Sequence, residues 1–509
     1  MDQDHVVLGL TGNAKLGHTL DNTLGEVENG DAHVHGGFDG VENHGYDPKL
    51  FDDDGKPRRT GNVWTSAAHI ITAVIGSGVL ALSWSFAQMG WIAGPIVLLA
   101  FAWCTYYTSR LLADCYRSPH PITGKRNYIY MDAIKANLGR KQQIVCAWVQ
   151  YSNLVGTSIG YTIATATSAK AIQQQNCFHK DPSAQCWAST TVYIGVFGLI
   201  QIVLSQIPNF GELWWLSYVA ATMSFLYSFI GLGLGISRSV EGGHDYGSVT
   251  GQPICYPPVS GVCGTRPEKV WNIFTALGNM AFAYSFSMIL IEIQDTIRNP
   301  PSESSQMKKA TFISICTTTF FYMSVAICGY AAFGDQAPGN LLTGFSSPYW
   351  LVDFANTCIV IHLIGAYQVY TQPVYGFVEL WCSKRWPNAG FLHTEWNARI
   401  PGVGVWKVNA FRLIWRTIYV IVTTIISMVI PFFNSVLGII GAVGFWPLTV
   451  YYPIEMYIRQ VHVKKWSRKY ILLQILSFVT LLVSIAGLIG GVAGIIQALK
   501  DVTLFKATP

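Results

Sequence analysis

The sequence has few charged residues for its length, which excludes an ordinary soluble domain. Only 12% of its 509 residues are Asp, Glu, Lys or Arg, whereas 51% are apolar. Soluble globular proteins contain about 25% charged residues. Apolar runs of about 20 residues, the length that crosses a bilayer as a helix, recur along the chain. We therefore expect a polytopic membrane protein that is embedded in the lipid bilayer.

Several motifs and signals are also missing. The chain has no N-x-S/T glycosylation sequon, no His-Glu-x-x-His, no Gly-rich phosphate loop and no paired-cysteine metal motif. We therefore expect a protein that is not an enzyme, with no cofactor, no metal and no nucleic-acid partner. Residues 1–60 are polar and lack the apolar core of a cleavable signal peptide. They predict a disordered cytosolic tail in front of a transmembrane domain at 61–509.

Apolar segments separated by polar connectors predict an all-α membrane protein with eleven transmembrane helices. Each segment is long enough to cross the hydrocarbon core as a helix. The approximate limits are 63–88, 91–115, 143–171, 190–207, 213–237, 270–293, 310–333, 349–380, 412–431, 435–457 and 470–497.

The positions of Lys and Arg predict the orientation of these segments. The stretch from Arg117 to Lys141 holds six of them, and the connectors after the sixth, eighth and tenth segments are also basic. By contrast, Lys180 is the single basic residue between the third and fourth segments. Because basic connectors stay in the cytosol, the N-terminus is expected to be cytosolic and the C-terminus extracellular.

Four of the eleven cysteines fall in connectors that this orientation places outside. Cys177 and Cys186 lie between the third and fourth segments, and Cys255 and Cys263 lie between the fifth and sixth. Disulfides persist on the oxidising side of a membrane. We expect a Cys177–Cys186 bridge, whereas for the second pair a bridge and two free thiols are both open.

The first apolar segment contains a predicted break. The run from His69 to Gln88 is long enough to span a bilayer, but Gly76-Ser77-Gly78 lies at its middle. Two glycines lower the cost of leaving the helix. Freed backbone groups are tolerated inside a membrane only where they face a cavity or a ligand, and secondary transporters place substrate sites at such breaks. The alternative is a helix–helix contact between small residues.

Motifs in most of the segments resemble those of plant amino acid permeases, in the amino acid/auxin permease family. Agreement extends from about Arg59 to the C-terminus. The runs that carry it include Gly76–Trp84 (GSGVLALSW), Leu112–Ser118 (LADCYRS), Gly124–Tyr128 (GKRNY), Ser205–Phe210 (SQIPNF), Leu290–Thr296 (LIEIQDT), His362–Gln368 (HLIGAYQ) and Gly444–Pro453 (GFWPLTVYYP).

The resemblance implies a fold and a function. The implied fold is of the leucine-transporter type, with inverted repeats at about 63–237 and 270–457 and the segment 470–497 outside them. A second break in the sixth segment, around Ala281–Phe286, is implied by the resemblance alone, because no glycine or proline lies there. The implied function is proton-coupled import of amino acids across the plasma membrane.

A substrate site at the first break would need donors for a carboxylate and acceptors for an ammonium group. The N–H groups that begin the second half-helix suit the carboxylate, and the carbonyls that end the first half-helix suit the ammonium. For any one of the aromatic candidates, ordinary packing is the alternative. The substrate-binding candidates are Ile75, Gly76, Ser77, Gly78, Val79, Tyr151, Asn153, Phe282, Ala283, Tyr284 and Ser285.

Proton coupling would need a group that changes protonation during the transport cycle. Ionisable residues inside membrane segments are functional candidates, and here they are His69, Glu292, Asp353 and His362. A histidine titrates near neutral pH, although a neutral, hydrogen-bonded interior histidine is an equal alternative. One departure from the family pattern is Asn279, at a position where many relatives carry aspartate.

The leading functional hypothesis is a proton-coupled symporter for neutral and acidic amino acids. Two alternatives remain at this point. One is an auxin carrier of the same family, and the other is a nutrient-sensing receptor that retains the transporter fold.

Overall fold

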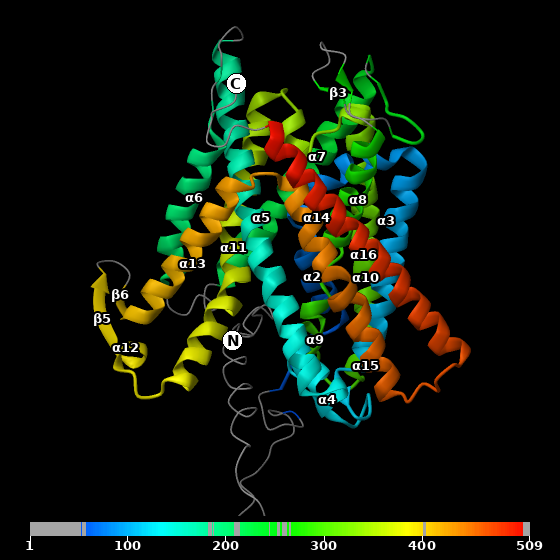
Figure 1. Cartoon of the computed structure of the whole chain (residues 1–509), viewed down its shortest axis with the longest axis vertical. Helices are drawn as coiled ribbons and strands as arrows, with labels where there is room; N and C mark the ends of the chain where they lie inside the picture. Colours follow the sequence, from blue (N-terminus) through cyan, green and yellow to red (C-terminus); the bar gives the residue numbers. More distant parts are fainter. Residues whose placement is uncertain are drawn as a thin grey trace, which may run out of the picture.

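The structure, a computed structural model, is built almost entirely from helices (Figure 1). It describes residue 52 and residues 58–501, except 182–185, 187, 208–213, 244, 252–254, 257–261, 264–265 and 401–403. Most of the predicted 1–60 tail therefore lies outside the described residues.

The long helices run along one axis of the molecule, and short elements lie at its two ends (Figure 1). The α-helices are α2 Val63–Val74, α3 Leu82–Asp114, α4 Tyr130–Leu138, α5 Arg140–Lys180, α6 Thr190–Ser205, α7 Trp214–Glu241, α8 Arg266–Ala283, α9 Leu290–Gln294, α10 Glu303–Phe333, α11 Tyr349–Arg385, α12 Gly390–His393, α13 Ala410–Val429, α14 Phe433–Gly444, α15 Tyr452–Gln460 and α16 Arg468–Asp501. The 3₁₀ helices are η1 Ser77–Ala81, η3 Ser287–Ile289, η4 Gly334–Gln336 and η5 Leu341–Gly344. The element η6 Phe445–Tyr451 is a π-helix.

Three two-stranded antiparallel hairpins connect some of these helices. They pair β1 Arg117–Ser118 with β2 Lys125–Arg126, β3 Cys255–Tyr256 with β4 Val262–Cys263, and β5 Glu395–Ile400 with β6 Gly404–Asn409.

The expectation of a helical membrane protein is confirmed, but the count of eleven spans is not. Within the described residues, eight helices are long and apolar enough to cross a membrane. Each predicted segment coincides with one or more helices. The counts differ because α2 and α6 are short, η1 and α3 form one continuous run, and α5 carries many polar residues. Eleven spans and the inverted repeat stay predictions.

A sharp turn at Gly90 separates the first predicted span from the second. Gly90 has φ +77°, a conformation that favours glycine. The connector between α7 and α8 fills this turn: Trp91 N–H donates to Ser248 O at 3.2 Å, and Trp91 Nε1 donates to Tyr246 O at 2.9 Å. A Cβ at Gly90 would lie 2.3 Å from Val249 O, so no larger residue fits.

The connectors divide between the two ends of the molecule. One end, which we call the basic end, carries α4, α9, α12, the β5–β6 hairpin and the end of α15 (Figure 1). The basic connectors of the sequence lie there. The opposite end carries β3 and the disulfide end of α5 (Figure 1).

A buried cluster of opposite charges fixes the start of α2 at the basic end. Arg59 pairs with Asp52 at 2.5 Å and with Glu303 at 2.9 Å, and Arg117 pairs with Glu303 at 2.6 Å. Tyr116 Oη donates to Asp295 at 2.8 Å. The cluster therefore joins the chain before α2 to the α3–α4 connector and to the start of α10.

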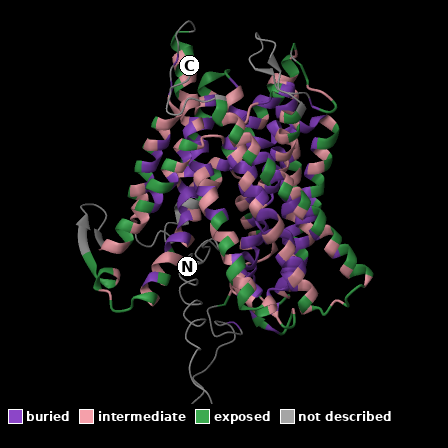
Figure 2. Cartoon of the chain, viewed as in Figure 1, coloured by how far each residue is buried: buried purple, intermediate pink, exposed green. Residues whose placement is uncertain are grey.

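Buried residues concentrate at the centre of the helix bundle, and exposed ones lie on its outer surfaces (Figure 2). The outer surfaces nevertheless include many large apolar side chains. On α16, for example, Leu472 is 67% exposed and Phe478 is 60% exposed. Such a surface is stable against lipid chains rather than water.

Candidate substrate site

The first break interrupts the helix between α2 and η1. Helix α2 ends at Val74, Ile75 and Gly76 are extended, and a 3₁₀ turn runs from Ser77 to Ala81. Val79 N–H donates to Gly76 O at 3.2 Å, so this donor is already used inside the turn. The break at the glycines is as predicted, and the backbone leaves the helix one residue before Gly76.

The second break lies between α8 and α9, where the resemblance placed it. Helix α8 ends at Ala283, and the chain continues through Tyr284–Phe286 into η3 and α9. No glycine lies at this break, and the Ser285 Oγ donates to Ala281 O at the helix end at 2.7 Å. Serine hydroxyls compete with the helical backbone in this way.

The two breaks touch each other. A Cβ at Gly78 would lie 3.1 Å from Ala283 Cα and 3.3 Å from Ala283 Cβ. The small size of Gly78 therefore lets the first break pack directly on the end of α8.

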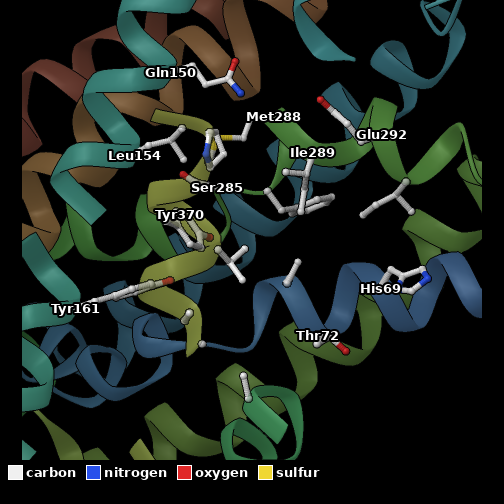
Figure 3. A pocket seen from close by; sticks show the side chains of 18 of the residues that line it. His69, Thr72, Gln150, Leu154, Tyr161, Ser285, Met288, Ile289, Glu292 and Tyr370 are labelled. Carbon is white, nitrogen blue, oxygen red and sulfur yellow. The ribbon is translucent and has the colours of Figure 1, made fainter. Parts of the chain in front are cut away.

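A cavity of about 210 Å³ opens beside the breaks (Figure 3). It lies among α2, α5, α7, η3–α9 and α11, and it reaches Met131 of α4 near the basic end. Its walls are mainly apolar with a few convergent polar groups, as is typical of small-molecule sites. The polar side chains that line it are His69, Thr72, Gln150, Tyr151, Tyr161, Ser285, Glu292, His362 and Tyr370.

Three of the four coupling candidates line this cavity: His69, Glu292 and His362. Glu292 Oε1 accepts a hydrogen bond from Tyr130 N–H at 3.1 Å. Its Oε2 has no hydrogen-bond partner among the described residues. The fourth candidate, Asp353, lies apart from the cavity, where it accepts a hydrogen bond from Asn176 Nδ2 at 2.6 Å.

The hydrogen bond of His362 determines which ring nitrogen can titrate. His362 Nδ1 lies 2.7 Å from Ala220 O. Because a carbonyl only accepts, Nδ1 carries the hydrogen. Nε2 then faces the first break, 3.9 Å from the Cβ position of Gly76. It is the basic nitrogen of a histidine that lines the cavity.

The structure divides the substrate-binding candidates into two groups. Ile75, Gly76, Tyr151 and Ser285 line the cavity. The remaining candidates, which do not line it, are Ser77, Gly78, Val79, Asn153, Phe282, Ala283 and Tyr284.

Two members of the second group face other helices. Asn153 Nδ2 donates to Ile440 O of α14 at 3.0 Å, so its amide points away from the cavity. Tyr284 Oη donates to Thr319 Oγ1 of α10 at 2.9 Å. These contacts engage the polar groups of two of the candidates with neighbouring helices.

Several cavity residues were missed by the sequence analysis, notably Gln150, Tyr161 and Tyr370. Gln150 precedes the candidate Tyr151 and is an uncharged polar residue inside an apolar segment, which was a usable signal. Tyr161 and Tyr370 stack edge to face with ring centroids 5.3 Å apart, one from α5 and one from α11. Only the packing of these two helices identifies that pair.

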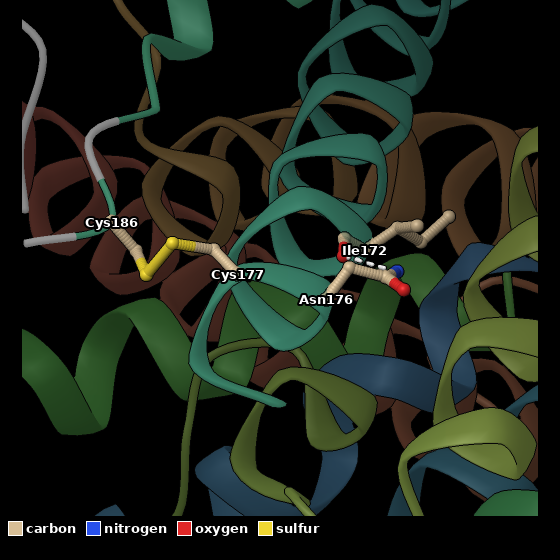
Figure 4. Close-up of a disulfide and its surroundings, with 4 residues drawn as sticks. All are labelled: Ile172, Asn176, Cys177 and Cys186. Atoms are coloured by element: carbon tan, nitrogen blue, oxygen red, sulfur yellow. Dashed lines mark hydrogen bonds between the residues drawn. A yellow bond between two sulfur atoms is a disulfide. The ribbon is translucent and has the colours of Figure 1, made fainter. Parts of the chain in front are cut away.

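The two predicted cysteine pairs lie at the opposite end, and the structure describes the side chains of the first pair. Cys177, at the end of α5, and Cys186 form a disulfide (Figure 4). Cys255 and Cys263 are register partners in the β3–β4 hairpin. Their side chains lie outside the described residues.

Comparisons with known proteins identify the family of the chain. The family model described as transmembrane amino acid transporter protein matches residues 59–497. Amino acid permease 3 of Arabidopsis thaliana is 54% identical, over 90% of this chain and 96% of that protein. Amino acid permease 8 of the same plant is 51% identical, over 95% of this chain and 98% of that protein. The resemblance to plant amino acid permeases is confirmed, as is the expectation of a transporter and not an enzyme.

A solved structure shows a weaker likeness. The structure of MhsT in complex with L-phenylalanine has a TM-score of 0.47 and 10% identity, over 86% of this chain and 100% of that chain.

Proposed function

The chain belongs to the transmembrane amino acid transporter family, in the branch of the plant amino acid permeases, and we propose that it is a proton-coupled symporter. It imports neutral and acidic amino acids across the plasma membrane by alternating access. The observation that carries this proposal is the cavity beside the first break, which holds His69, Glu292 and His362.

The cavity supplies groups for both ends of an amino acid. Helix α2 ends at the cavity, so its last carbonyls and its negative dipole end suit an ammonium group. Tyr151 is a hydroxyl donor that suits a carboxylate. The mainly apolar wall between them accommodates a neutral side chain.

His362 is the coupling group that the geometry favours. Its Nδ1–H is held by Ala220 O, so Nε2 can take up a proton without a change of tautomer. Nε2 also faces Gly76, at the point where the substrate would bind. A bound proton there changes the charge beside the first break, which links the proton to the amino acid.

The proposed orientation places the basic end in the cytosol. This follows from the concentration of Lys and Arg in the connectors at that end. With this orientation, the cavity, which reaches Met131 of α4 at the same end, lies toward the cytosolic face. The C-terminus is then extracellular.

The proposal is tested by electrical recording from oocytes that express the chain. Adding alanine should produce an inward current that grows as the outside pH falls and that persists when sodium is replaced. One proton moving through 100 mV contributes about 2.3 kcal/mol, enough for roughly a fiftyfold accumulation of a neutral amino acid. A current that vanishes without sodium would refute proton coupling.

The same recordings separate the alternatives. A current evoked by auxin but not by alanine would identify an auxin carrier, and alanine binding without flux would identify a receptor.

His362→Ala should flatten the pH dependence of the alanine current. A matched control is His179→Ala, because His179 stacks on Tyr349 near the disulfide and lies outside the cavity. An unchanged pH profile in His362→Ala would move the coupling role to His69 or Glu292.

A further inference from the structure

One buried tyrosine of α10 contacts both breaks. Tyr322 Oη donates to Val74 O at 2.5 Å and lies 3.3 Å from Ala283 O. Val74 is the last residue of α2, and Ala283 is the last residue of α8. A single hydroxyl group therefore joins the carbonyl ends of the two interrupted helices.

These two carbonyls need such a donor. The last carbonyls of a helix have no partner within it, and an unpaired carbonyl in a dry interior is costly. Both helix ends are also the negative ends of their dipoles, so they repel each other where they meet. A hydroxyl has one hydrogen to donate, which explains one short contact to Val74 O and one longer contact to Ala283 O.

Tyr322 contacts both breaks without lining the cavity. Val74, Ala283 and Tyr322 do not line the cavity, whereas the neighbouring Ala73, Ile75 and Ser285 do. The hydroxyl therefore leaves the cavity face of both breaks open.

Three further contacts with the same segments hold α10 and Tyr322 in place. Thr319, one turn before Tyr322, accepts the hydrogen bond from Tyr284 of the second break at 2.9 Å. The Tyr284 and Tyr322 rings stack edge to face with centroids 5.6 Å apart. Ser314 Oγ lies 3.1 Å from Ala67 O of α2.

We propose that Tyr322 is a positioning residue that sets the spacing between the two breaks and thereby preorganises the substrate site. Its role rests on the proposed function, because the site that it shapes is the amino acid site. Without the hydroxyl, the two carbonyl ends separate, and the substrate must restore their arrangement when it binds. Apparent affinity falls more than the maximal rate of transport.

The test compares Tyr322→Phe with Tyr330→Phe. Tyr330 is a matched control because it lies on the same helix and its buried hydroxyl donates to Asp335 at 2.6 Å, away from the breaks. In oocytes, Tyr322→Phe should raise the KM for alanine at least tenfold while the maximal current per surface molecule changes less than twofold. Tyr330→Phe should leave the KM within twofold of the unmutated value.

Two results would overturn the positioning role. They are a KM within twofold of normal in Tyr322→Phe, and an equal loss of current in both variants. If Tyr322→Phe does not reach the surface, alanine binding by the purified variant decides: a Kd raised at least threefold supports the role, and an unchanged Kd refutes it. Absence of an alanine current in the unmutated chain would refute the proposed function instead, and alanine binding by purified protein would then test Tyr322.

Discussion

The two breaks interrupt their helices by different chemical means. At the first, Gly76 ends a short extended segment, and Gly78 lies in the 3₁₀ turn that follows and packs on Ala283. At the second, no glycine lies between α8 and η3, and the Ser285 hydroxyl donates to Ala281 O at the helix end. The first break therefore requires a residue without a side chain at Gly78, whereas the second carries a serine hydrogen bond at its helix end. Substitutions should affect them unequally.

The largest effect is expected at Gly78. Valine there would place branched methyl groups against Ala283, where even a Cβ lies at 3.1 Å from backbone. Gly78→Val should abolish alanine uptake, with a loss of at least fiftyfold, while protein still reaches the surface. Gly76→Ala should reduce alanine uptake less than threefold, because only His362 Nε2 lies within 4 Å of the new Cβ. Uptake assays normalised to surface protein measure alanine uptake by both variants. Similar losses of uptake in Gly78→Val and Gly76→Ala would show that packing between the breaks is unimportant.

A smaller effect is expected at the second break. Ser285→Ala removes the bond to Ala281 O and one hydroxyl from the cavity wall. A single hydrogen bond contributes about 1 kcal/mol, so the KM for alanine should rise about fivefold. Ser285→Thr retains the hydroxyl and should recover most of this loss. A KM for Ser285→Ala that matches the unmutated value would show that the second break does not need its hydroxyl.

The smallest effect concerns Asp132 of α4, beside the basic end of the cavity and outside both breaks. Burial raises the pKa of this carboxyl to about 6. Because the folded pKa lies above the unfolded value of 3.8, the group favours the fold at low pH. That contribution is lost as the pH rises through about 6.

Asp132→Asn should therefore raise the melting temperature of purified protein by a few degrees at pH 7.5 and by less at pH 5. Alanine binding should be affected much less than by substitutions at the breaks. The same increase at both pH values would contradict the raised pKa.

The comparison of the breaks also explains what could be predicted from sequence. Gly76-Ser77-Gly78 is a local signal, because glycine lowers the cost of leaving a helix wherever it occurs. The second break has no such signal: a serine within an apolar segment more often stays helical, and here it acts through its bond to Ala281. That break was predicted only from the resemblance to the permeases.

Side-chain direction was the part that the sequence could not provide. Tyr151 and Asn153 were chosen together from α5, yet Tyr151 lines the cavity and Asn153 bonds to α14. Residues two apart on a helix point in different directions, and which direction meets the cavity depends on how α5 packs. Likewise, the presence of His69, Glu292 and His362 in one cavity depends on three different helices coming together.

The most direct test of the central claim asks whether an amino acid occupies the cavity beside the first break. Ala73 lines the cavity on α2, whereas Ala68, on the same half-helix, is exposed and does not line it. Ala73→Cys and Ala68→Cys, in a background that retains the Cys177–Cys186 disulfide but lacks other accessible cysteines, would be modified with a thiol reagent with and without alanine. We predict that saturating alanine slows modification of Ala73→Cys at least fivefold and leaves Ala68→Cys unchanged. Equal rates for Ala73→Cys with and without alanine would contradict the account.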